Sequence, residues 1–189
     1  MMNLSYKMGK TLQLHLLLCV VAIIFTGCAS KPKSSMPTHL PAPQQLDYLR
    51  KLAMPKNLPV PVEGISRKQL RDTWGAARSS GRSHEGIDIM AATGTKVYAA
   101  TDGIIMSLKG NNLGGTVIWK VGPAGVWHYY AHLNAHKRGL KEGDFVRQGE
   151  HIGYVGYSGN ASKSAPHLHY GIYLSGKGRG ATNPYPYLK

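Results

Sequence analysis

Thiols are almost absent from this chain of 189 residues, which has only two cysteines, Cys19 and Cys28. Both lie near the start, so the sequence after them offers no thiol for a disulfide, a thiolate metal site or a cysteine nucleophile. Phenylalanine is equally scarce, with 2 residues, whereas there are 23 glycines and 11 tyrosines. This composition favours short strands joined by tight turns over long helices.

Acidic residues are also few, 9 against 23 lysines and arginines, which gives a formal net charge of +14. Such a charge indicates a polyanionic partner, and nucleic acid, anionic lipid and the bacterial wall all qualify. The basic residues are spread along the chain without a dense run, so there is no specific nucleic-acid signal. The simplest interpretation is a solvated basic surface on an envelope protein.

No apolar run is long enough for a membrane-spanning helix, which needs about 20 residues. The run over 12–25 follows Lys7 and Lys10, and this pattern is typical of a secretory signal peptide. Phe25-Thr26-Gly27-Cys28 then resembles a bacterial lipobox, with Phe25 where leucine is usual. The resemblance implies a lipoprotein signal peptide over 1–27 and lipidation of Cys28; an uncleaved N-terminal anchor is the alternative.

The segment 28–61 is predicted to be a tether that starts at the lipidated cysteine. Residues 29–43 are rich in Ser, Pro and Lys and cannot bury a core. A short helix is possible over 44–54, with leucines along one side, and Pro55 would end it. The folded domain is therefore expected over 62–189.

Short β-branched runs with turn signals dominate the rest of the chain. Asp102-Gly103 predicts a hairpin within 96–108, and the glycines around Pro123 predict another. The expected strands cover 116–121, 126–132, 145–146, 151–155 and 167–174. Such strands predict an all-β fold, mostly antiparallel, as a sandwich or an open barrel.

Histidines form three patterns in this domain. His84 and Asp88 lie four residues apart, and both side chains are good zinc ligands. His167 and His169 alternate on an expected strand, so both rings should project to one side. That pair is either a surface pair or bound to a metal, because two buried imidazoles are costly without partners.

The third pattern places His128, Tyr130 and His132 on one face of an expected strand. This is either a proton-transfer surface or an aromatic sheet face. Two histidines and one aspartate leave a fourth zinc position for water, which is the arrangement of a catalytic site. Spare histidines can then move protons or stabilise an oxyanion.

These motifs, in this order, resemble the lysostaphin/LytM-type zinc endopeptidases of bacterial cell walls. The resemblance runs from about Trp74 to Leu188. Its motifs are the following: GRSHEGIDI (81–89), ATGTKVYAATDGII (92–105), Tyr130-Ala131-His132-Leu133, GDFVRQGEHIGYVGYSGN (143–160), His167-Leu168-His169 and Asn183-Pro184.

The resemblance implies one Zn²⁺ bound by His84, Asp88 and His169, with His132 and His167 as the catalytic pair. His128 competes with His132 for that role, and family position favours His132. His136 and His151 are expected at the surface. Four residues are candidates for contacts with the substrate: Arg82, Tyr130, Ser158 and Asn160.

The implied substrate is peptidoglycan, and the expected bond is D-Ala–meso-diaminopimelate, which would make the chain a DD-endopeptidase. The expected location is the cell envelope, with the lipid at Cys28 in the outer membrane and the domain facing the periplasm. Two alternatives stay open. One is a non-enzymatic LytM-domain regulator that activates a cell-wall amidase, and the other is a wall-binding structural lipoprotein.

Overall fold

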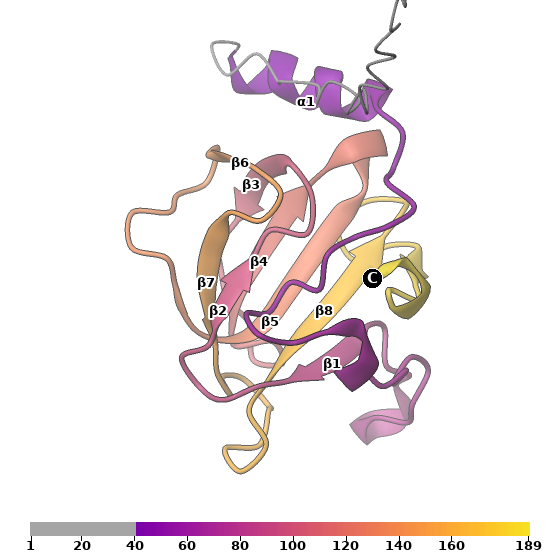
Figure 1. The fold of residues 1–189 in the computed structure, drawn as a ribbon, viewed down its shortest axis with the longest axis vertical. Helices are drawn as coiled ribbons and strands as arrows, with labels where there is room; N and C mark the ends of the chain where they lie inside the picture. Colours follow the sequence, from indigo (N-terminus) through magenta and orange to yellow (C-terminus); the bar gives the residue numbers. More distant parts are fainter. Residues whose placement is uncertain (1–40) are drawn as a thin grey trace, which may run out of the picture. The chain divides into compact units, whose positions relative to one another are not determined.

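A computed structural model describes residues 41–189, and the expected signal peptide and Cys28 lie outside these residues. The described chain contains one α-helix, α1 (Ala42–Lys51), and otherwise strands and short 3₁₀ turns (Figure 1). None of its helices is long and apolar enough to cross a membrane. The strands are β1 (Ile87–Met90), β2 (Lys96–Tyr98), β3 (Gly103–Ser107), β4 (Thr116–Val121), β5 (Trp127–His136), β6 (Phe145–Val146), β7 (His151–Val155), β8 (His167–Tyr173) and β9 (Ala181–Thr182).

These strands form one open sheet, in which the named strands pair antiparallel in the order β1-β8-β5-β4-β3-β6. β8 pairs with the first half of β5 and β7 with its second half, while β2 and β9 lie beside β7 and β8. The predicted class, mostly antiparallel β, is confirmed. The strands make a single sheet rather than the two sheets of a sandwich.

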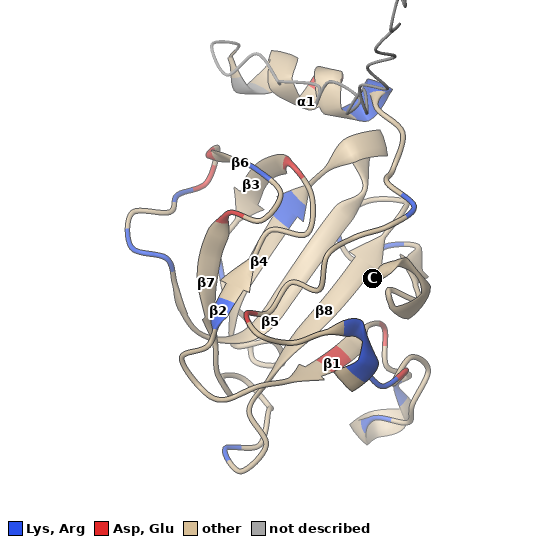
Figure 2. Ribbon diagram, in the orientation of Figure 1, with Lys and Arg blue, Asp and Glu red and all other residues tan. Residues whose placement is uncertain are grey.

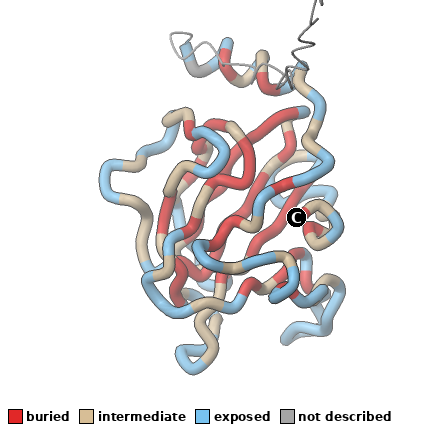
Figure 3. Tube along the Cα trace, viewed as in Figure 1, coloured by how far each residue is buried: buried red, intermediate tan, exposed pale blue. Residues whose placement is uncertain are grey.

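One face of the sheet carries the main core, and buried positions follow the strands (Figure 3). β-branched and aromatic side chains at alternate positions supply it, as a half-buried sheet requires. Ile118 and Tyr130 are examples, and both are completely buried. The buried cluster on the opposite face is smaller and mostly aromatic; its members are Val117, Trp119, Tyr129, Ala131 and Tyr173.

The folded unit begins well before Val62, so the expected boundary between tether and domain at 61/62 is wrong. Leu49 of α1 is buried against Ile104 of β3. Leu58 is buried in the main core, where its N–H donates to the Tyr187 carbonyl at 2.7 Å. Apolar side chains in this proline-rich stretch gain enough by burial to fix it against the sheet.

The helix is shifted towards the N-terminus from the expected 44–54. Prolines at its first turn fix a helical φ without losing a hydrogen bond. The helix ends at Lys51, before Pro55, because Leu52 is already extended.

The hairpin predicted at Asp102-Gly103 is also wrong. β2 pairs with β7, whereas β3 pairs with β4 and β6. Gly103 is needed instead for a close approach between strands, since a Cβ there would lie 2.3 Å from the Val121 carbonyl oxygen. The second predicted hairpin, β4–β5, is confirmed.

Lysine and arginine lie on several separate segments (Figure 2). One lysine, Lys120 of β4, is completely buried. Its Nζ donates to Thr101 Oγ1 at 2.6 Å, to the Thr101 carbonyl at 3.0 Å and to the Asp102 carbonyl at 3.1 Å. Burial lowers the pKa of Lys120 to about 7. The unfolded chain therefore binds a proton that the folded chain lacks above this pH.

We predict that the free energy of unfolding rises with pH between pH 7.5 and 9, by about 1 kcal/mol per pH unit from this group. The rise occurs because the pKa of a lysine in the unfolded chain is about 10.4, so over this range the unfolded chain keeps a proton that the folded chain has lost. Urea denaturation at several pH values, with chelator present, measures it. Lys120→Met is expected to remove this component, and parallel pH profiles for the two proteins would contradict the prediction.

Candidate metal and catalytic site

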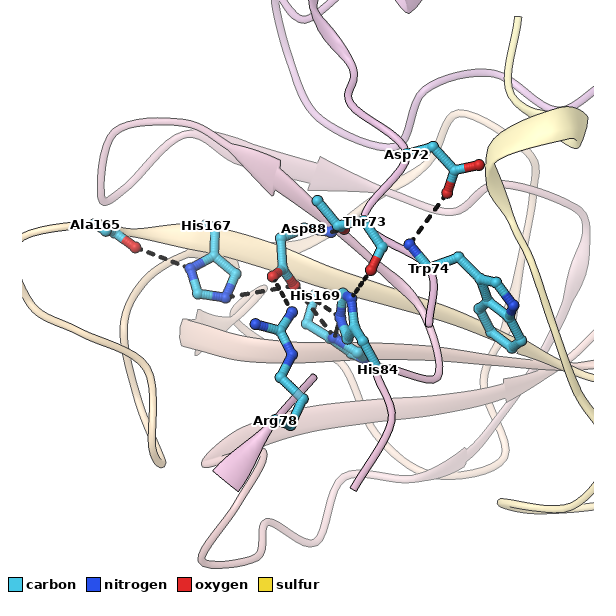
Figure 4. Close-up of polar contacts among 9 residues, drawn as sticks. All are labelled: Asp72, Thr73, Trp74, Arg78, His84, Asp88, Ala165, His167 and His169. Atoms are coloured by element: carbon cyan, nitrogen blue, oxygen red, sulfur yellow. Dashed lines mark hydrogen bonds and ion pairs between the residues drawn. The ribbon is translucent and has the colours of Figure 1, made fainter. Parts of the chain in front are cut away.

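Three side chains from two neighbouring strands and the loop before them converge on one point (Figure 4). Asp88 of β1 lies directly opposite His169 of β8 in the antiparallel register. His84 reaches the same place from the loop that precedes β1. Its Nε2 lies 2.8 Å from His169 Nδ1 and 3.1 Å from Asp88 Oδ1, and His169 Nδ1 lies 3.3 Å from Asp88 Oδ1.

The distances between these three atoms suit a zinc ion. Ligands at about 2.0–2.1 Å from a tetrahedral zinc lie roughly 3.3 Å apart, close to the separations observed. His84 Nδ1 lies 2.7 Å from the Thr73 carbonyl oxygen, which can only accept a hydrogen bond, so the ring proton is on Nδ1. Nε2 is then unprotonated, and its lone pair can bind a metal. A donor set of two imidazoles and one carboxylate suits Zn²⁺.

The ionised form of the Asp88 carboxyl group is strongly favoured. Burial raises the pKa of this carboxyl, but hydrogen bonds with His169 and His84 outweigh burial and hold the pKa well below its usual range. The Arg78 guanidinium contacts the other carboxylate oxygen, Oδ2. Burial also lowers the pKa of His169, which favours the neutral imidazole that binds metals.

Gly86 allows the His169 ring to occupy its place. A Cβ at position 86 would lie 2.7 Å from His169 Cε1 and 2.7 Å from the Tyr170 carbonyl oxygen. The contribution of this glycine is the space that it leaves beside the ring.

Two further imidazoles lie beside this cluster. The His132 and His167 ring centroids are 4.9 Å apart, and His167 Nε2 lies 3.7 Å from Asp88 Oδ1. His132 Nδ1 donates to the Ser158 carbonyl at 2.8 Å, and His167 Nδ1 donates to the Ala165 carbonyl at 2.8 Å. Each ring thus keeps Nε2 for a proton or a substrate atom. Burial lowers the pKa of His132 to about 4.

A β-bulge brings His132 to this face of the sheet. Thr116 and Ile118 pair with Leu133 and Tyr130, so β5 has one more residue than β4 between these pairs. His132 takes a left-handed conformation there, with φ 62°. The extra residue reverses the alternation of side chains, as bulges do. The expectation that His128, Tyr130 and His132 share a face is therefore wrong.

His128 and Tyr130 both stay buried beside Tyr170, and only His132 is turned towards the cavity. Tyr130 is completely buried, and its hydroxyl accepts a hydrogen bond from the Ala100 N–H at 3.0 Å, so its prediction as a substrate contact is wrong. His128 is also buried, with Nδ1 2.8 Å from the Tyr170 hydroxyl. His136 and His151, expected at the surface, are half-buried.

Ser158 holds the bulge rather than lining the cavity, which corrects its prediction as a substrate contact. Its Oγ accepts from the Thr116 N–H at 2.9 Å and donates to the Leu133 carbonyl at 2.7 Å, and these two residues form the pair that flanks the bulge. Its carbonyl accepts from His132. Ser158 therefore fixes both the bulge and the imidazole that the bulge presents.

A cavity of about 1130 Å³ opens over the five polar side chains. Arg82 and Asn160, two predicted substrate contacts, line it, and the residues of α1 and of 52–61 do not. Arg82 Nη2 donates to Ser79 Oγ at 3.1 Å. The lining includes His84, Asp88, His132, His167, His169, Trp119, Tyr129 and Tyr173.

Sequence reasoning missed Thr73 and Arg78. Thr73 accepts from His84 through its carbonyl and, through Oγ1, from the Asp88 N–H at 3.0 Å. Both residues lie in irregular segments that have no periodicity, so no pattern in the sequence pointed to them.

Comparisons with known proteins agree with this geometry. The sequence profile of peptidase family M23 matches residues 82–184, and the chain belongs to this family. The match contains all five converging side chains.

Among its relatives, the L-Ala–D-Glu endopeptidase of Bacillus subtilis is 41% identical over 130 residues, which cover 63% of this chain and 39% of that protein. The DD-carboxypeptidase/endopeptidase Mpg of Neisseria meningitidis is 42% identical over 97 residues, covering 51% of this chain and 21% of that protein. The chain thus spans well under half the length of both.

A solved structure of a putative glycyl-glycine endopeptidase lytM from Ruminococcus gnavus has a TM-score of 0.56. It is 33% identical and covers 71% of this chain and 59% of that one.

We predict that His84→Ala, Asp88→Ala and His169→Ala each weaken zinc binding by more than about 100-fold, because each removes a ligand; losing an outer partner costs about 10–100-fold. Zinc titration of the purified full chain against a competing chelator measures this. His132→Ala and His167→Ala are the matched controls, which are expected to bind one equivalent as the unaltered chain does. Loss of zinc in both controls, or its retention in Asp88→Ala, would contradict the ligand assignment.

Proposed function

We propose that this chain is a zinc-dependent endopeptidase that hydrolyses peptide cross-bridges of peptidoglycan. The observation that carries the proposal is the convergence of His84 Nε2, Asp88 Oδ1 and His169 Nδ1. Two further imidazoles lie beside them, each with its Nδ1 hydrogen-bonded to a carbonyl oxygen. Family membership and the peptidoglycan endopeptidases among the relatives support the same conclusion.

The residues of the chain divide the chemistry between them. Zinc, when bound by His84, Asp88 and His169, lowers the pKa of a water molecule and polarises a carbonyl group. His132 and His167, fixed by carbonyl acceptors, receive and return the proton and stabilise the oxyanion. Arg82 and Asn160, on the cavity wall, contact the peptide.

The bond that we propose is D-Ala–meso-diaminopimelate, and the DD-carboxypeptidase/endopeptidase among the relatives supports a DD specificity. A second candidate is L-Ala–D-Glu. The relative from Bacillus subtilis, which aligns over 130 residues, is an L-Ala–D-Glu endopeptidase. The amidase-regulator alternative needs no metal ligands, whereas all three ligand positions are occupied here by ligating side chains.

Purified full chain with zinc is expected to release soluble peptides from isolated peptidoglycan. His169→Ala or a chelator should abolish the release, since both remove the metal. Mass spectrometry of the products identifies the bond: new D-Ala carboxyl ends identify a DD-endopeptidase, and new D-Glu amino ends identify the second candidate. Undiminished release by His169→Ala would refute the proposal.

We further propose that Cys28 is lipidated and that the chain is anchored in the outer membrane, with its peptidase domain facing the periplasm. The apolar run, the small residues before Cys28 and Ala29 after it support this location.

Cys28→Ser is expected to leave the chain without lipid, so that it fractionates with soluble envelope proteins instead of membranes. Radiolabelled fatty acid incorporation and membrane fractionation check this result. Cys19→Ser is the matched control, since Cys19 lies inside the signal peptide and should not matter. Membrane association of Cys28→Ser equal to that of the control would contradict the anchor.

A further inference from the structure

Arg78 contacts the carboxylate oxygen of Asp88 that the histidines do not, Oδ2 instead of Oδ1. It lies on one arm of a tight turn, in which its N–H donates to the Arg82 carbonyl at 2.8 Å and Ala77 pairs with Ser83. Its guanidinium contacts Asp88 Oδ2 (Figure 4). The Arg78 side chain is 37% exposed and that of Asp88 is 15% exposed, so the guanidinium extends from the cavity to the carboxylate.

The guanidinium of Arg78 keeps most of its donors for a ligand. An arginine carries five N–H donors in a planar fork that suits carboxylates. Within residues 41–189, Asp88 is the side chain that contacts it, through Nη2. Because Arg78 also lines the cavity, its remaining donors are available to a ligand there.

The two candidate bonds have one chemical feature in common. In L-Ala–D-Glu the glutamate continues through its side-chain carboxyl, so its α-carboxylate is free. In D-Ala–meso-diaminopimelate the amine-side centre carries its own free carboxylate. In both, the carbon that bears the scissile nitrogen also bears a carboxylate, which a glycine bridge lacks.

We propose that Arg78 is a specificity-determining residue that binds this free carboxylate on the amine side of the scissile bond. The proposal rests on the proposed function and deepens it. Arg78 contacts Oδ2 of Asp88, whereas Oδ1 of the same carboxylate is the proposed zinc ligand. A substrate carboxylate bound to Arg78 is therefore held next to the proposed zinc site. That short separation matches the position of the substrate carboxylate beside the scissile amide.

A purely structural role predicts a different result. If Arg78 only holds Asp88 in place, its loss weakens zinc binding and lowers hydrolysis of every substrate alike. If Arg78 binds the substrate carboxylate, its loss lowers hydrolysis of carboxylate substrates selectively. The ratio of kcat/KM between two matched peptides therefore separates the two roles.

The test uses synthetic peptides of both bond types, each with a free amine-side carboxylate or with the same group as a carboxamide. For the bond type that it cleaves better, the zinc-loaded full chain is expected to have a kcat/KM about 10- to 100-fold higher on the carboxylate peptide than on the carboxamide peptide. This ratio is the contribution of a charged hydrogen-bond pair. Arg78→Ala should reduce this preference to less than about threefold, and Arg78→Lys should restore part of it. Arg138→Ala, an exposed arginine outside the cavity, is the matched control.

A binding measurement keeps the inference separate from catalysis. Calorimetry with the cleavage product that bears the carboxylate, and with its carboxamide, should show tighter binding of the carboxylate to the zinc-loaded chain and no preference in Arg78→Ala. Zinc content is measured in parallel. If no peptide is hydrolysed, the proposed function fails while the binding difference still decides the role of Arg78. An unchanged preference in Arg78→Ala, in either assay, would overturn the inference.

Discussion

The antiparallel register between β1 and β8 is the constraint on which the site depends. It places Asp88 directly opposite His169, on the face of the sheet that lines the cavity. A slip of one residue would carry the carboxylate to the core face and separate it from both histidines. Ile87, Ile89, Leu168 and Tyr170 lie on the other face and are all buried, so the main core fixes this register.

Backbone carbonyls then determine which nitrogen of each ring can react. His84, His132 and His167 each have Nδ1 next to a carbonyl oxygen, which directs Nε2 towards the cluster or the cavity. These acceptors come from loops that close against the sheet, so the fold rather than the strand pattern sets the tautomers. Ser158 adds a second constraint, because the same residue closes the bulge and accepts from His132.

Local periodicity in the sequence predicted much of this arrangement. The strands over 116–121, 145–146 and 151–155 have the expected bounds, and His167 and His169 share a face because residues two apart on a strand do. The bulge at His132 could not be predicted, since it depends on pairing with β4 and on Ser158, far along the chain. The hairpin at Asp102-Gly103 failed for a similar reason: the partner of β2 is the distant β7. Thr73 and Arg78 gave no signal because irregular segments have no pattern.

The proposed function requires that one zinc ion is held by His84 Nε2, Asp88 Oδ1 and His169 Nδ1. X-ray diffraction from crystals of the zinc-loaded chain, measured on both sides of the zinc absorption edge, tests it most directly. We expect a single strong anomalous peak in contact with these three atoms, with His132 and His167 outside the bonding distance of about 2.0–2.1 Å. A peak bound by other side chains, or no peak in fully loaded protein, would contradict it.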